Sequence, residues 1–190
     1  MGLLITGVVI FFAAHFYTAF RSRAPGKDIK EKMGEGPYMG LYSIVSAIGL
    51  GLMIYGYTKA SPSGNIYIGP EWASAAAAAL MLIAFILLMA AYVPGTHIQK
   101  IIKHPMLSAV ILWSAAHLLI GANQQKLILF GSFLLFSLVD FVAASKRPSE
   151  QTTAHPAITR DMVAVAIGSG LFAGTFFWAH EAIFGVAIAF

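Results

Sequence analysis

The stretch His104-Pro105-Met106-Leu107-Ser108-Ala109-Val110-Ile111-Leu112-Trp113-Ser114-Ala115-Ala116-His117 decides the fold. It is apolar except for two serines and the histidine at each end. It starts with a proline, which the first turn of a helix tolerates because the backbone N–H there has no intrahelical partner. Four side chains recur at three- and four-residue steps and share one helix face: Met106, Val110, Trp113 and His117. An ionisable side chain inside an apolar span marks a functional site by default, so His117 is the first candidate.

The composition of the whole chain is that of an integral membrane protein. Apolar residues make up 58% and charged residues 11%, the mean hydropathy is +0.78, and a soluble domain carries roughly 25% charged residues. We therefore expect one all-α transmembrane domain over residues 1–190, in contact with the lipid bilayer and with no nucleic-acid partner. The chain has no cysteine, which excludes disulfides, thiolate haem ligands and zinc–thiolate sites.

Six apolar stretches are long enough to be membrane spans, since roughly 20 apolar residues cross a bilayer core. They are residues 3–20, 38–58, 71–93, 105–121, 126–144 and 161–179. No basic residue precedes the first of them, which favours a retained span over a cleaved signal peptide. The second span is rich in glycine and serine, and small residues let membrane helices approach closely.

The basic residues predict the orientation. With the N-terminus outside, the three cytoplasmic loops hold five, two and three lysines and arginines, and the outer loops hold only Lys59 and Lys126. Cytoplasmic loops carry the excess of lysine and arginine. The sequence therefore predicts a six-helix bundle in a bacterial inner membrane, with both termini on the periplasmic side.

A second histidine, His15, lies in the first span, six residues before Arg21 and so roughly 9 Å inside the membrane edge. His117 lies twelve residues beyond Pro105, roughly 18 Å along its span. Two histidines on different helices suit a haem clamped between opposed imidazoles. The alternative for each is a local hydrogen bond, to a neighbouring carbonyl or hydroxyl for His15 and to Ser114 for His117.

Three further residues belong to this candidate site. Trp113, one turn before His117, either stacks on a flat cofactor or packs in the bundle. His104, at the start of its helix, either caps the helix or pairs with His15 in place of His117. Asp140 is the carboxylate inside the fifth span, and it either orients His15 by accepting an N–H bond or forms a salt bridge with Arg21, Lys146 or Arg147. Of the remaining histidines, His97 and His155 are expected to be solvated in loops, and His180 is a candidate for an exposed pair with Glu181.

The sequence resembles the NnrU family of membrane proteins. The resemblance rests on a histidine in the first span followed by arginines and on these segments: Met33-Gly34-Glu35, Leu41-Tyr42-Ser43, His104-Pro105-Met106-Leu107, Leu112-Trp113-Ser114-Ala115-Ala116-His117-Leu118-Leu119 and Leu129-Phe130-Gly131-Ser132-Phe133. It covers residues 1–147.

The family is associated with bacterial denitrification, and its plant relative is 15-cis-zeta-carotene isomerase, a haem b enzyme. The resemblance implies His15 and His117 as iron ligands and haem b as the cofactor. In the isomerase a cysteine lies three residues before the second histidine, where this chain has Ser114. A switch to thiolate ligation therefore cannot occur here.

The leading hypothesis is a bis-histidine haem b protein that acts in redox chemistry or sensing, with a membrane redox partner. One alternative is a haem-dependent isomerase acting on an apolar polyene in the bilayer. A weaker alternative is a membrane methyltransferase, which needs an arginine–glutamate pair near the C-terminus that the apolar end of this chain lacks. The fourth hypothesis is a scaffold protein without a cofactor.

Overall fold

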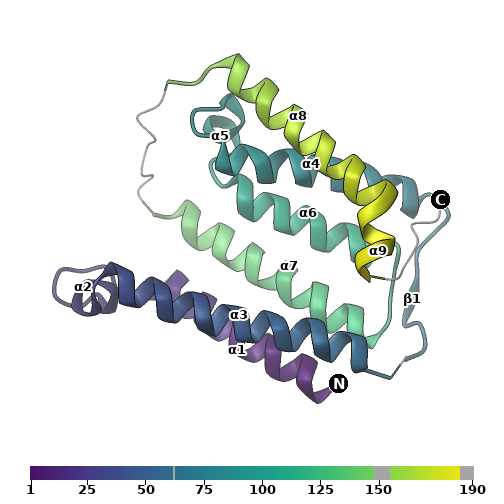
Figure 1. Cartoon of the computed structure of the whole chain (residues 1–190), viewed down its shortest axis with the longest axis horizontal. Coiled ribbons are helices and arrows are strands. Elements are labelled where there is room, and N and C mark those ends of the chain that lie inside the picture. The colour runs from purple at the N-terminus through teal and green to yellow at the C-terminus, as the bar shows by residue number, and fades with distance from the viewer. Residues whose placement is uncertain (62, 148–154, 185–190) are drawn as a thin grey trace.

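The computed structural model describes residues 1–61, 63–147 and 155–184, and it is predominantly helical (Figure 1). The elements in chain order are α1 (Gly2–Phe20), α2 (Ile29–Met33), α3 (Glu35–Lys59), β1 (Tyr67–Ile68), α4 (Ala73–Tyr92), α5 (His97–Ile102), α6 (Pro105–Leu119), β2 (Gly121–Ala122), α7 (Gln124–Ser145), α8 (Ile158–Gly174), the π-helical turn η1 (Thr175–Ala179) and α9 (His180–Phe184).

The helices confirm an all-α membrane protein. Within the described residues, five helical segments are long and apolar enough to cross a bilayer: α1, α3, α4, α7 and Ile158–Ile183. Helix α6 is apolar but has only 15 residues, about 22 Å at 1.5 Å per residue. Many large apolar side chains point outward, among them Val9, Ile44 and Leu135, each more than 60% exposed. The count of six spans and the orientation of the termini remain predictions.

Along the chain the long helices alternate in direction, and they pack in the order α3–α1–α7–α6–α4–α8, in which the neighbours α1 and α7 run parallel. Helix α7 therefore lies between α1 and α6, whose backbones do not approach each other closely. One end of the bundle holds the C-terminal end of α1 and the short helix α2, and we call it the α2 end. The opposite end, at which β1 pairs antiparallel with β2, is the β1 end (Figure 1).

Helices α1 and α3 pack at backbone distance through glycines. A Cβ atom on Gly7 would lie 2.5 Å from the backbone nitrogen of Met53, and one on Gly49 would lie 2.7 Å from that of Phe11. The predicted close approach is thus confirmed at Gly49, whereas a Cβ on Gly51 would meet nothing within 4 Å. The contact buries Leu4 and Met53 completely.

The predicted spans match the helices to within a few residues, but the connections hold structure that the apolar pattern does not indicate. Two short helices lie in them, α2 capped by the side chain of Asp28 and α5 capped by that of Thr96. The last span continues past residue 179 into α9. Of the segments whose structure we predicted, residue 62, part of the loop before α8 (148–154) and the tail beyond α9 (185–190) lie outside the described residues.

Candidate functional site

His15 lies on α1 in an aromatic environment. Its Nδ1 is 2.7 Å from the carbonyl oxygen of Phe11. Because a carbonyl only accepts hydrogen bonds, Nδ1 carries the proton and Nε2 keeps its lone pair. The imidazole stacks on the ring of Phe11 at 3.9 Å between centroids and meets the ring of Phe136 edge-on at 5.6 Å. The hydrogen bond to a neighbouring carbonyl, predicted as the alternative to haem binding, is therefore present at Nδ1 of His15. It still leaves Nε2 as a lone-pair donor for a ligand.

His117 on α6 repeats this arrangement. Its Nδ1 is 2.8 Å from the carbonyl oxygen of Trp113, and its ring stacks on Phe130 of α7 at 4.4 Å with the planes 14° apart. Ser114, the partner that the sequence offered, is fully buried, and its hydroxyl has no hydrogen-bond partner among the described residues. The backbone, and not Ser114, therefore sets the tautomer of His117.

Helix α7 connects the two histidines through its aromatic side chains. The ring of Phe133 lies 5.5 Å from that of Phe11 and 5.3 Å from that of Trp113. Phe11 stacks on His15, and Trp113 lies 5.2 Å from His117. A continuous path of ring contacts therefore runs from one histidine to the other across the face of α7.

The two histidines lie at different depths along α7. His15 meets Phe136 and His117 meets Phe130, and six residues correspond to about 9 Å of helix. Both rings fold back toward the residue four positions earlier, and α1 and α6 run in opposite directions, so each ring leans toward the level of the other. The structure does not bring His15 and His117 into ring contact.

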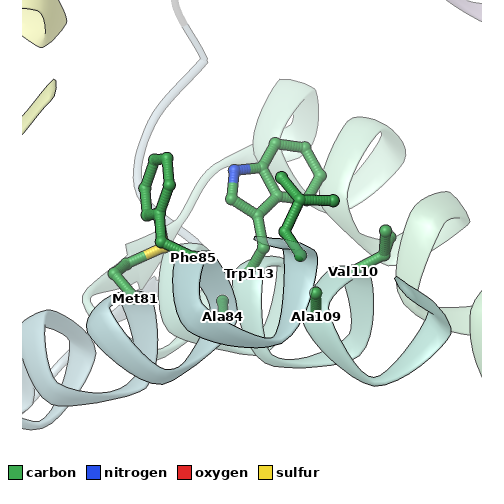
Figure 2. A pocket seen from close by; sticks show the side chains of 7 residues that line it. Met81, Ala84, Phe85, Ala109, Val110 and Trp113 are labelled. Atoms are coloured by element: carbon green, nitrogen blue, oxygen red, sulfur yellow. The ribbon is translucent and has the colours of Figure 1, made fainter. Parts of the chain in front are cut away.

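Trp113 also forms one wall of an apolar groove between α4 and α6 (Figure 2). The groove has a volume of about 240 Å³ and is lined by Met81, Ala84, Phe85, Leu88, Ala109, Val110 and Trp113. The buried alanines Ala84 and Ala109 lie at its floor, and Phe85 and Trp113 stand above them. Trp113 therefore contacts both this groove and the ring of His117.

The other two predicted site residues lie toward the α2 end. His104 is the N-cap of α6, and its ring meets Phe141 edge-on at 5.6 Å. Asp140 forms an ion pair with Arg147 at 3.3 Å, which is the salt bridge predicted as an alternative to orienting His15. Arg147 also donates to the carbonyl oxygen of Ala19 at 2.5 Å. Asp140 thus helps to fasten the end of α1 to α7.

Two polar links at the α2 end lie outside the predicted site. The carboxylate of Asp161 accepts from His97 at 2.7 Å and from the backbone N–H of Ile98 at 3.2 Å. His97 therefore links α5 to α8. In the sequence, the only sign that a helix starts here is Thr96, which is the N-cap of α5. Arg21 pairs with Asp28, and this hydrogen-bonded guanidinium holds the pKa of Asp28 below its usual value.

The described residues contain no group of three or more histidine, cysteine or acidic side chains that could hold a metal ion. His15 and His117 each present a free Nε2 within aromatic walls, which fits the chemistry of a haem iron. Binding one iron by both rings requires them to approach each other along α7.

Comparison with known proteins identifies the family. No curated protein and no solved structure matches the chain. The family model of the NnrU protein matches residues 3–188, nearly the whole sequence. The chain therefore belongs to the NnrU family.

Proposed function

We propose that this NnrU family protein binds haem b through His15 of α1 and His117 of α6 and acts in redox chemistry or sensing linked to nitrogen-oxide metabolism. It would cross the bacterial inner membrane six times, with both termini on the periplasmic side. The family match supports membership of the NnrU family, and the proposed pathway rests on the association with denitrification that the family resemblance implies.

One observation supports the proposal most directly. Both histidines bond Nδ1 to the carbonyl oxygen four residues earlier, at 2.7 and 2.8 Å, and each keeps Nε2 for a ligand. Metal-bound histidines nearly always donate their other N–H to such a group, which fixes the tautomer and the ring orientation.

The surrounding residues have separate roles in this proposal. The carbonyls of Phe11 and Trp113 hold the two imidazoles in the ligand tautomer. The rings of Phe130 and Phe133 pack against Trp113 and would form apolar walls beside the haem. A bound haem would supply a one-electron redox couple, and ligation by two histidines leaves no open position for a substrate, which favours electron transfer or sensing.

The groove beside Trp113 supports a second candidate, the isomerisation of an apolar polyene. Its lining is apolar, as such a substrate needs. Its wall Trp113 lies 5.2 Å from His117 between ring centroids, so the groove is close to the proposed haem ligand. Because position 114 is serine, any such activity would proceed without thiolate ligation.

The first test is the absorption spectrum of the detergent-purified protein, oxidised and then reduced with dithionite. We expect a Soret band and, on reduction, the sharp α and β bands of six-coordinate haem b. His15→Ala and His117→Ala should each convert the spectrum to that of a five-coordinate haem or lose the haem. His97→Ala, which removes a histidine from the α5–α8 link, is the matched control and should keep the wild-type spectrum.

His104→Ala separates the two possible pairings of His15. If His104→Ala changes the spectrum and His117→Ala does not, His104 is the second ligand. A protein that stays colourless after addition of haem would refute haem binding and leave the methyltransferase or the scaffold. Conversion of a polyene by the purified protein, measured by chromatography, would establish the second candidate.

A further inference from the structure

A second groove lies on the outer surface of the bundle, where the last turn of α1 meets the final turns of α7. It has a volume of about 460 Å³ and is lined by Phe20, Leu138, Val139, Val142, Ala143 and Lys146. Phe20, Leu138 and Val142 are each about half exposed. In a membrane protein, this apolar surface faces lipid chains. The groove is separate from the candidate haem site.

Lys146 is the one charged residue of the lining. It is the C-cap of α7 and is exposed at the α2 end, and no ion pair joins it to an acidic side chain among the described residues. The neighbouring cations are engaged, since Arg147 pairs with Asp140 and Arg21 pairs with Asp28. Lys146 therefore offers an ammonium group that no acidic side chain in the described part of the chain neutralises.

The positions of the two parts match a phospholipid. Lys146 follows Val142 by four residues, about 6 Å along the helix axis, so the ammonium group lies just beyond the apolar part of the groove. A lysine at the end of a membrane helix lies at the level of the lipid headgroups, and basic residues beside a membrane attract anionic lipids.

We propose that this groove binds one acyl chain of an anionic phospholipid, with the lipid phosphate on Lys146. The lipid would cover the seam between α1 and α7, close to the contact of Arg147 with the carbonyl oxygen of Ala19. It would thereby hold together the two helices between which His15 meets Phe136.

The test is native mass spectrometry of the detergent-purified full chain, incubated with phosphatidylglycerol or with phosphatidylcholine of the same acyl chains. We expect the wild-type protein to retain more phosphatidylglycerol than phosphatidylcholine. Lys146→Gln should reduce this preference about fivefold, the effect of one lysine at a membrane surface. Lys126→Gln, at the other end of α7, is the matched control and should keep the preference. Ala143→Phe fills the groove and should reduce retention of both lipids.

Two outcomes would overturn the proposal. One is an unchanged preference for phosphatidylglycerol in Lys146→Gln, a surface substitution that leaves the packing of α7 intact. The other is undiminished lipid retention in Ala143→Phe, with its fold verified by circular dichroism. The result does not depend on haem, since the lipids are counted by mass, and a colourless protein can still confirm the lipid site.

Discussion

The imidazole of His117 lies flat against the ring of Phe130, with the centroids 4.4 Å apart and the planes 14° apart. Phe130 is 8% exposed and also meets Trp113 edge-on at 5.0 Å. The ring of His117 is therefore held by α7 on one face, while its Nδ1 is held by the backbone of α6.

Phe130 should consequently matter for stability as well as for the orientation of His117. We expect Phe130→Ala to cost about 3–5 kcal/mol of unfolding free energy, because it leaves a cavity between α6 and α7. Phe130→Leu keeps most of the apolar volume and should lose mainly the ring contact, about 0.5–1.5 kcal/mol. Denaturant unfolding in detergent, followed by circular dichroism, measures both losses.

Phe177→Ala, at a site 66% exposed, is the control and should stay within about 0.5 kcal/mol of wild type. Equal losses for the alanine and leucine variants would contradict this account.

The contact between α1 and α3 gives a second prediction. A methyl group at Gly49 would lie 2.7 Å from the backbone nitrogen of Phe11, so Gly49→Ala should force the helices apart and cost about 1–3 kcal/mol. The control is Gly51→Ala, two residues along the same helix, where a Cβ meets nothing within 4 Å. There alanine should be neutral or stabilise the protein by up to about 1 kcal/mol, because alanine favours the helix. Thermal unfolding of the pair is the measurement, and a Gly51→Ala variant as unstable as Gly49→Ala would show that close packing is not the cause.

The ion pair between Asp140 and Arg147 is the basis of a third prediction. Asp140→Asn and Arg147→Met should each destabilise the protein, and the double variant should reveal a coupling of about 0.5–3 kcal/mol, as for residues in contact. The orientation of His15 should not change in Asp140→Asn, because its Nδ1 is bonded to the carbonyl of Phe11. NMR of labelled imidazole nitrogens reports the tautomer directly. A changed tautomer in Asp140→Asn would restore the hypothesis that Asp140 orients His15.

The sequence predicted the helices well, because the length of an apolar run sets a membrane span. The ends differ for local reasons. Helix α3 begins at Glu35, three residues before the predicted start, because the first turn of a helix accommodates an acidic residue and Pro37. Helix α6 ends at Leu119, since Gly121 has a φ of 140° and belongs to the strand that pairs with β1.

The order of the helices could not be predicted. Charge asymmetry assigns loops to the two sides of a membrane but says nothing about which helices are neighbours. The position of α7 between α1 and α6 therefore had no signal in the sequence. The depth difference between His15 and His117 did have one, because the helical rise places the two residues roughly 9 Å and 18 Å from the same membrane edge. The link from His97 to Asp161 spans 64 residues. It joins the starts of two helices that far apart in the chain, and no periodicity in the sequence could reveal it.

The pair of Arg21 and Asp28 allows a prediction of pH dependence. The pKa of Asp28 is lowered in the folded protein, chiefly by its hydrogen bond from Arg21. The stabilisation is therefore fully present above the ordinary aspartate value of 3.8 and is lost as the pH falls through the lower, folded value. Asp28→Asn isolates the charge, because asparagine can still cap α2 as Asp28 does through the backbone N–H of Lys30. We expect the variant to unfold at a lower temperature than wild type at pH 7 and the difference to vanish once Asp28 is protonated. A difference that persisted unchanged after Asp28 is protonated would show that the ion pair does not carry the stabilisation.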